Sequence, residues 1–213
     1  MPVGLSACRH HDHARTHYFD TIAEEWDDRY GLEATERIRA WCQSLRMPMN
    51  ASILDVGCGT GVSSVACAER SDAPRRVVAL DLSRGMLREG RKKRGNNRVH
   101  WVCATGTRIP IADHSFDVVL ALHVWPHIDD GGVALAEWYR VLRPGGMLYL
   151  AHLISRDTVN SRHRSANEVR EDILPPATDL ARFIGGRGFT VVETEDADRY
   201  RISAIRNEDG GIG

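Results

Sequence analysis

Three glycines and an acid in the first half of the chain can form a binding site for a nucleotide-like ligand. Residues 53–61 read ILDVGCGTG, an apolar run followed by glycines at every second position. A buried strand that enters a helix through such a turn lets the backbone approach a ligand, because a Cβ there would fill ligand space or prevent the turn. Asp81 ends the next apolar run about 20 residues later, where a carboxylate can bind the hydroxyls of an unphosphorylated ribose.

The spacing of these glycines differs from that of two phosphate-binding motifs. A dinucleotide-binding turn reads G-x-G-x-x-G, and Val62 occupies the position of its third glycine. A P-loop needs a lysine after the turn, and none follows here. An NAD-dependent oxidoreductase remains the alternative at the level of fold, because Asp81 would suit the ribose of NAD equally well.

Four histidines in the second half of the chain are candidates for proton transfer. His123 and His127 follow an apolar run and are four residues apart, so they share a face if the segment is helical. His152 ends the next apolar run, and His163 lies in a polar segment that also contains Arg156, Arg162 and Arg164. Imidazole exchanges protons near neutral pH, so these residues predict a general base. The arginines add cationic character that suits an anionic or soft nucleophile; structural support is the alternative role for each histidine.

The composition indicates one globular domain of 213 residues, with 42% hydrophobic and 27% charged residues. A net charge of −1 creates no field that would attract nucleic acid or an anionic membrane. No apolar run is long enough to span a bilayer, and no secretory signal is evident. Five cysteines without a C-x-x-C pair suit reduced thiols, so we expect a cytoplasmic protein. Residues 1–16, rich in histidine, are predicted to be flexible, with a metal site as the alternative.

Short apolar runs that alternate with helical patterns predict an α/β fold with a parallel sheet. A helical pattern with aromatic residues starts at Tyr18 and ends at Tyr30 and Gly31, and a second helix follows to Leu45. The last two strands are joined by a short connection, which indicates antiparallel pairing. The predicted strands are residues 53–56, 76–81, 99–103, 118–122, 147–152, 188–193 and 200–205.

Four segments in this order resemble the class I S-adenosylmethionine (SAM)-dependent methyltransferases of the small-molecule, methyltransferase-11-like type. They are the aromatic helix, DVGCGTG at 55–61, SFDVV at 115–119 and RVLRPGG at 140–146. The resemblance implies a Rossmann-like seven-stranded sheet of order 3-2-1-4-5-7-6, with strand 7 antiparallel and helices on both faces. It also implies a single domain over 17–206, with N-terminal lid helices (17–46) and a substrate-specific insert (153–174).

The resemblance carries over to individual residues. SAM is the implied cofactor, and a small molecule is the implied methyl acceptor. Thr105 departs from the family, which usually places an adenine-binding acid there. The implied cofactor-binding residues are Asp55, Gly57, Cys58, Gly59, Gly61, Asp81, Leu82, Met86, Thr105, Gly106, Thr107 and Leu122. The implied acceptor-binding residues are Tyr18, Trp26, Tyr30, Trp125 and His163, and the catalytic candidates are His123, His127 and His152.

Other classes of methyltransferase would carry different residues after the fourth strand. A nucleic-acid methyltransferase would carry an N-P-P-Y-like tetrad or a Pro-Cys nucleophile after the fourth strand, and the sequence LHVWP at 122–126 is neither. A metal-dependent catechol-type enzyme would place acidic ligands there, and this chain has none until Asp129 and Asp130. A non-catalytic SAM- or metal-binding regulatory module stays open beside the oxidoreductase. The acceptor stays open among arsenic, sulfur and quinone-type compounds, and we expect a monomer or homodimer without nucleic-acid or membrane partners.

Overall fold

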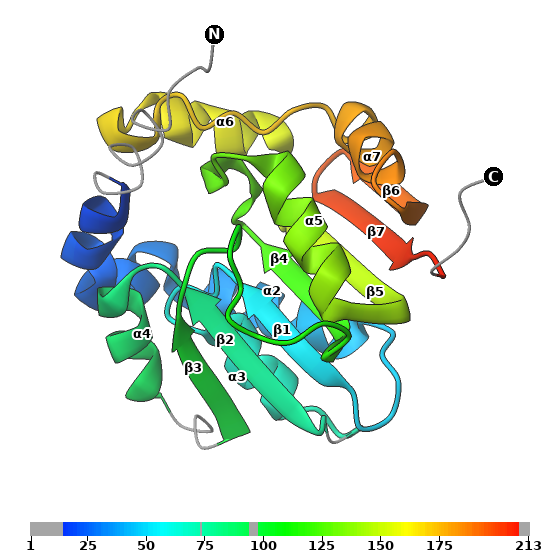
Figure 1. Ribbon diagram of the computed structural model, residues 1–213. Coiled ribbons are helices and arrows are strands. Elements are labelled where there is room, and N and C mark those ends of the chain that lie inside the picture. The colour runs from blue at the N-terminus through cyan, green and yellow to red at the C-terminus, as the bar shows by residue number, and fades with distance from the viewer. Residues whose placement is uncertain (1–14, 73, 94–97, 209–213) are drawn as a thin grey trace, which may run out of the picture.

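The computed structural model describes residues 15–72, 74–93 and 98–208. Residues 1–14 of the His-rich stretch, for which we predicted flexibility, lie outside the described residues. Within the described part of the chain, seven strands form one sheet (Figure 1). They are β1 (Ser52–Val56), β2 (Arg76–Asp81), β3 (Val99–Cys103), β4 (Phe116–Leu122), β5 (Leu142–His152), β6 (Phe189–Asp196) and β7 (Tyr200–Arg206).

The strand order is β3-β2-β1-β4-β5-β7-β6, as the family resemblance implied. β1 pairs in parallel with both β2 and β4, and β2–β3 and β4–β5 are also parallel. β7 runs antiparallel to both β5 and β6. The strand order reverses at β1, so the carboxyl ends of β1 and β4 diverge into a crevice, the usual ligand position in open α/β sheets.

Helices cover both faces of the sheet because buried side chains in the parallel strands point alternately to two cores. On β1, Ile53 packs into one core with the helices α2 to α4, and Leu54 packs into the other with α5 to α7. Figure 1 shows α5 crossing the face nearer the viewer. The helices are α2 (Trp26–Ser44), α3 (Val62–Ala68), α4 (Arg84–Arg91), α5 (Gly131–Val141), α6 (Arg156–Arg164) and α7 (Ala177–Gly185), with short 3₁₀ turns η1 (Ala23–Glu25), η3 (Trp125–His127) and η4 (Asn167–Val169).

The N-terminal helices and the insert between β5 and α7 follow the sequence pattern. The chain is helical from residue 15 through η1 and α2, and Gly31 interrupts α2 with φ +72° and ψ 175°. The predicted helix break at Tyr30–Gly31 is therefore confirmed. The insert predicted at 153–174 contains α6 and η4. No helix in the described residues combines the length and apolarity needed to cross a membrane.

Candidate functional site

A cavity of about 810 Å³ lies where several parallel strands end. Its walls include Val56, Asp81, Leu122 and His152, which are the last residues of β1, β2, β4 and β5. The helical residues 15–30, called here the N-terminal segment, contribute a further wall, and α6 contributes another. The volume is within the range of about 300–1,000 Å³ common for small-molecule sites. The cavity occupies the switch point that the strand order creates.

The glycine turn between β1 and α3 needs glycine at three positions for two different reasons. All three have positive φ: +65° at Gly57, +55° at Gly59 and +75° at Gly61. A Cβ on Gly57 would come within 2.2 Å of the Val124 side chain, and one on Gly61 within 2.3 Å of the Trp101 ring. Packing within the protein therefore requires glycine at positions 57 and 61. Only Gly59 faces open space, and it is the position where a ligand can approach the backbone.

Asp55 supports this turn from beneath and does not line the cavity. It is 1% exposed, and its Oδ2 accepts hydrogen bonds from the Ser63 hydroxyl at 2.6 Å and the Ser64 hydroxyl at 2.5 Å. Burial raises its pKa to about 6. The bonds tie the end of β1 to the first turn of α3, so Asp55 positions the glycine turn instead of touching a ligand.

Asp81 is held in the cavity wall by two backbone groups. Its Oδ2 accepts from the amide N–H of Gly59 and its Oδ1 from that of Ser83, both at 2.8 Å. Burial raises the pKa of the carboxyl, and these backbone hydrogen bonds oppose the rise. Each carboxylate oxygen keeps acceptor capacity, because an ionised carboxylate offers about four lone-pair sites. Asp81 can therefore still accept from a pair of ribose hydroxyls.

The loop after β3 contributes hydroxyls to the cavity wall in place of an acid. The Oγ1 atoms of Thr105 and Thr107 lie 2.9 Å apart, and the Thr107 N–H also points to the Thr105 hydroxyl at 3.3 Å. The Gly106 carbonyl accepts from the Trp138 indole at 3.1 Å, which fixes the loop to the core. An adenine here would meet hydroxyls and backbone groups, as the sequence departure at Thr105 indicated.

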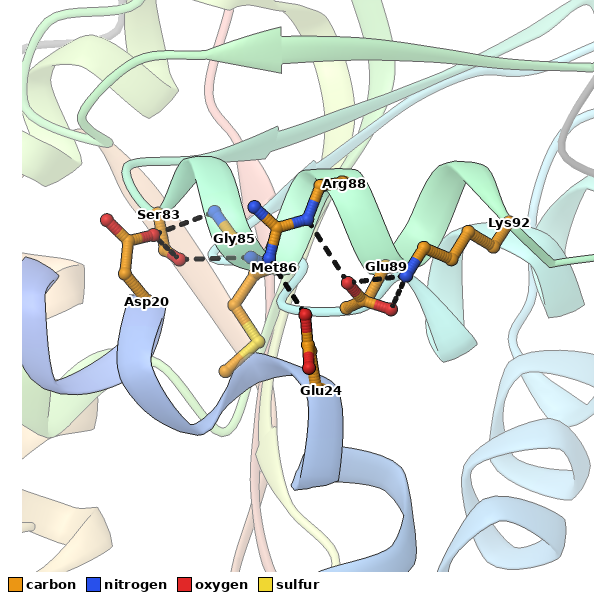
Figure 2. Close-up of polar contacts among 8 residues, drawn as sticks. All are labelled: Asp20, Glu24, Ser83, Gly85, Met86, Arg88, Glu89 and Lys92. Atoms are coloured by element: carbon orange, nitrogen blue, oxygen red, sulfur yellow. Dashed lines mark hydrogen bonds and ion pairs between the residues drawn. The ribbon is translucent and has the colours of Figure 1, made fainter.

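The Asp20 carboxylate of the N-terminal segment binds the first turn of α4 (Figure 2). Asp20 Oδ1 accepts from the Ser83 hydroxyl at 2.6 Å and from the Gly85 amide at 2.7 Å. Ser83 is the N-cap of α4, and its hydroxyl accepts from the Met86 N–H at 3.0 Å. A second anchor joins Thr60 and Lys93 to Asp27, with the Thr60 hydroxyl donating at 2.6 Å. The segment is therefore fixed to the N-terminus of α4 through Asp20 and to the glycine turn through Asp27.

Replacing Asp20 by alanine is expected to loosen the N-terminal segment. The change removes two hydrogen bonds at a helix N-terminus, which we expect to cost about 1–3 kcal/mol of local stability. Amide hydrogen exchange over residues 15–22 should become faster while the sheet keeps its protection. Glu24→Ala is the matched control, because Glu24 meets Arg88 in an exposed ion pair at 3.5 Å (Figure 2) that contributes little. Equal exchange rates in both variants would contradict the docking role of Asp20.

His127 is held by a carboxylate from the insert. Its Nδ1 lies 2.6 Å from Oδ2 of Asp172, and the other Asp172 oxygen accepts from Arg15 at 2.9 Å. Arg15 also donates to the His127 carbonyl at 3.0 Å and pairs with Asp129 at 2.7 Å. With Nδ1–H donated to the carboxylate, Nε2 is the nitrogen that can accept a proton. His127 lines the cavity, so this pair has the arrangement of an oriented general base.

His123 and His152 form a second pair deeper in the cavity wall. Their Nδ1 atoms are 3.3 Å apart. His152 is 2% exposed, and its pKa is well below the usual value because burial disfavours the charged ring. The pKa of His123 is lowered to about 4, first by burial and then by the positive charge of Arg162. Both rings are therefore neutral at pH 7 and weaker bases than an ordinary histidine.

The pair should make the protein sensitive to acid. The unfolded chain protonates His123 near pH 6.5, whereas the folded chain does so only near pH 4, so its contribution to stability is present above pH 6.5 and is lost as pH falls toward 4. In urea unfolding, the stability of wild type relative to His123→Gln should fall by about 2 kcal/mol between pH 7.5 and pH 4.5. His100→Gln, on an exposed position of β3, is the control. If the difference in unfolding free energy between wild type and His123→Gln were the same at both pH values, the lowered pKa of His123 would be refuted.

The structure brings most of the predicted site residues to this one cavity. Three lie elsewhere: Asp55 is beneath the turn, Gly61 packs against Trp101, and Trp125 is in the core between Trp138 and Phe183, with ring centroids 5.9 and 6.4 Å away. Trp125 is therefore not part of the acceptor wall, because the η3 turn directs it into the core. The predicted residues that line the cavity are Tyr18, Trp26, Tyr30, Gly57, Cys58, Gly59, Asp81, Leu82, Met86, Thr105, Gly106, Thr107, Leu122, His123, His127, His152 and His163.

Sequence reasoning missed the residues that orient the site from a distance. Arg15 and Asp172 are 157 positions apart and meet only in the fold. Asp20 and Asp27 stand among apolar residues in the N-terminal segment, and acids on the exposed face of any amphipathic helix follow the same pattern. Arg29 and Arg37 also line the cavity. No local spacing distinguishes these residues from solvated charges.

Comparison with known proteins agrees with this geometry. A family model described as a methyltransferase domain matches residues 54–150. An O-methyltransferase from Aspergillus nomiae is 31% identical over 194 residues, which cover 84% of each chain. A demethylmenaquinone methyltransferase from Renibacterium salmoninarum is 35% identical over 137 residues, 62% of this chain and 56% of the relative. The chain thus spans little more than half the length of several curated relatives that it matches.

Solved structures show the same fold at low sequence identity. A SAM-dependent methyltransferase from Thermotoga maritima superposes with a TM-score of 0.72 at 18% identity, covering 91% of this chain and 100% of that one. A chain from the complex of a Haloferax volcanii methyltransferase with its activator Trm112 gives 0.75 at 19%, covering 89% and 98%. The chain belongs to the family of class I SAM-dependent methyltransferases. This assignment favours SAM over the NAD that the sequence left open.

Proposed function

We propose that the protein is an enzyme that transfers a methyl group from SAM to a small-molecule acceptor by in-line displacement. The observation that carries the proposal is one cavity with two chemically different ends. The glycine turn and Asp81 form one end. His127, which is oriented by Asp172, and aromatic side chains of the N-terminal segment form the other end. Methyl transfer needs both, because donor and nucleophile must be aligned in one site that excludes water.

The residues at the turn fit SAM. Gly59 leaves the backbone open, since a Cβ there would have no heavy atom nearer than Trp26 Nε1 at 3.8 Å. Asp81 suits the two ribose hydroxyls, and the turn lacks the lysine that a triphosphate would need. Leu82 and Met86 add apolar surface for the adenine. When bound, SAM supplies an electrophilic methyl on a sulfonium that leaves as a neutral thioether.

Of the three predicted catalytic histidines, we propose His127 as the general base. Asp172 holds its Nδ1–H and so keeps the ring in the tautomer whose Nε2 can take a proton from the acceptor. The carboxylate also favours the imidazolium that forms, because the opposite charge lies beside it. His123 and His152 are better suited to a structural role in the cavity wall, because their Nδ1 atoms contact each other and both rings have a lowered pKa.

The N-terminal segment supplies the roof of the acceptor site. Phe19 stacks edge-on against both Trp26 and His127, with ring centroids at 5.6 and 5.3 Å. Trp26 in turn contacts Tyr30 at 4.9 Å. These rings keep water from the base and give an acceptor an apolar surface. The names of the relatives include both a demethylmenaquinone methyltransferase and an O-methyltransferase, which supports a small organic acceptor.

Two measurements test the proposal. Thermal unfolding with SAM, S-adenosylhomocysteine and NAD should show stabilisation by the first two only, because binding to the folded state raises the melting temperature. Incubation with methyl-labelled SAM and pools of small organic metabolites should then give a labelled product. Stabilisation by NAD alone would overturn the proposal. SAM binding without any labelled product from a broad pool would favour the non-catalytic regulatory module.

We also propose that the protein acts in the cytoplasm. Four cysteines in the described residues are free thiols, and Cys42, Cys58 and Cys67 are buried. Burial raises the pKa of Cys58, and the contact with the Cys42 thiol, followed by burial, raises that of Cys67, so these two thiols are unreactive. Unpaired thiols without disulfides are typical of a reducing compartment.

A further inference from the structure

One side of the cavity carries arginines from two separate elements. Arg29 and Arg37 extend from α2, on either side of the break at Gly31, and Arg162 extends from α6 in the insert. Burial raises the pKa of Tyr30, and the positive charge of Arg162 opposes this rise. Burial lowers the pKa of His123, and the positive charges of Arg162 and Arg37 lower it further. The guanidinium groups therefore act on the same part of the cavity, beside the histidines and the aromatic roof.

These charges are poorly compensated within the protein. Arg29 and Arg37 meet Glu25 at 3.2 Å and Glu33 at 3.7 Å in exposed helical pairs, which stabilise little. Arg162 makes no ion pair with any residue in the described ranges. An anion that entered the cavity would find at least one guanidinium ready to bind it.

The acids that line the cavity each have a partner within the protein. Asp81 is held by the glycine turn, and Asp129 pairs with Arg15 at 2.7 Å. Asp130 caps α5, accepting from the Val133 N–H at 3.0 Å. Asp129 and Asp130 are thus occupied by groups of the protein, whereas Asp81 keeps acceptor capacity for the ribose and Arg162 is available to an anionic group on the acceptor.

We propose that the acceptor carries an oxyanion group on an aromatic body, and that Arg162, with Arg37, binds this group. The inference rests on the proposed function and extends it to the substrate class. A guanidinium presents several donors in one plane, which match the two oxygens of a carboxylate or the oxygens of a phosphate ester. The aromatic side chains of Trp26 and Tyr30 receive the ring, so charge and shape are recognised together.

The test compares two probes that differ by one carboxylate, 1-hydroxy-2-naphthoate and 1-naphthol. Calorimetry uses the full chain saturated with S-adenosylhomocysteine, whose own binding is measured first. We expect the naphthoate to bind about tenfold more tightly than the naphthol, in line with a charge-assisted hydrogen bond. Arg162→Gln should abolish this preference without changing the affinity for 1-naphthol, and Arg162→Lys should recover part of it.

Arg164→Gln is the matched control, since Arg164 is exposed on the same helix and lies outside the cavity lining. It should keep the full preference for the carboxylate. Equal affinities of the two probes in wild type, a preference that survives in Arg162→Gln, or no naphthoate binding would each overturn the inference. These results leave the proposed function intact as long as S-adenosylhomocysteine binds, and loss of that binding is what contradicts the proposed function itself.

Discussion

Replacing His127 by glutamine is expected to slow methyl transfer by about 10²- to 10⁴-fold, the range that a positioned general base contributes. Glutamine keeps a polar side chain that can bond to Asp172 but cannot take a proton. SAM affinity should remain unchanged, because the loss concerns the acceptor end of the cavity. The measurement is single-turnover transfer from methyl-labelled SAM to an acceptor found in the product screen.

Asp172→Asn gives an independent check of the same base. An amide at this position accepts the Nδ1–H less strongly and does not favour an imidazolium, so the rate should fall in the same direction. Because the two residues act as a unit, the double variant should be little slower than His127→Gln alone. His100→Gln, exposed on β3, serves as the control. A wild-type rate in His127→Gln would show that His127 is not the general base and would make His123 the next candidate.

Removing the Asp81 carboxylate is expected to have the largest effect on cofactor binding. Asp81→Ala eliminates the acceptors for two ribose hydroxyls and leaves the Gly59 and Ser83 amides without their partner. The loss of these charge-assisted hydrogen bonds should cost about 2–4 kcal/mol, which corresponds to about a 30- to 1,000-fold weaker Kd for SAM. Isothermal titration calorimetry measures the change directly.

A suitable control for this variant is Asp113→Ala. Asp113 also pairs in a loop, with Arg140 at 2.7 Å, but its side chain is 65% exposed and it does not line the cavity. SAM affinity should be the same as in wild type. Urea unfolding of both variants separates a binding defect from a general loss of stability. Undiminished SAM binding by Asp81→Ala would mean that the ribose lies elsewhere.

The sequence predicted the sheet and the cofactor end of the cavity because both depend on local patterns. An apolar strand, a glycine turn and a helix follow one another directly at residues 52–68, and the periodicity of each is visible without tertiary information. The break at Gly31 is also local, and it is found where it was predicted. The family resemblance added the order of the strands, including the antiparallel β7.

The acceptor end was less predictable because it is assembled from segments distant in the chain. The sequence indicated several histidines but not which would meet a carboxylate, and it offered Trp125 as a pocket residue although it packs in the core. The reason for glycine at positions 57 and 61 was also hidden, because Val124, after β4, and Trp101, on β3, contact the turn from other parts of the fold.

The sequence by itself therefore determined the class of fold, the glycine turn and the carboxylate beyond it. Only the tertiary structure decided that Asp172 and Arg15 orient His127, that His123 and His152 are paired, and that Arg162 faces the cavity. The physical reason is that a strand or turn is specified by neighbours along the chain. A contact between side chains 157 positions apart is specified only by how the helices pack on the sheet.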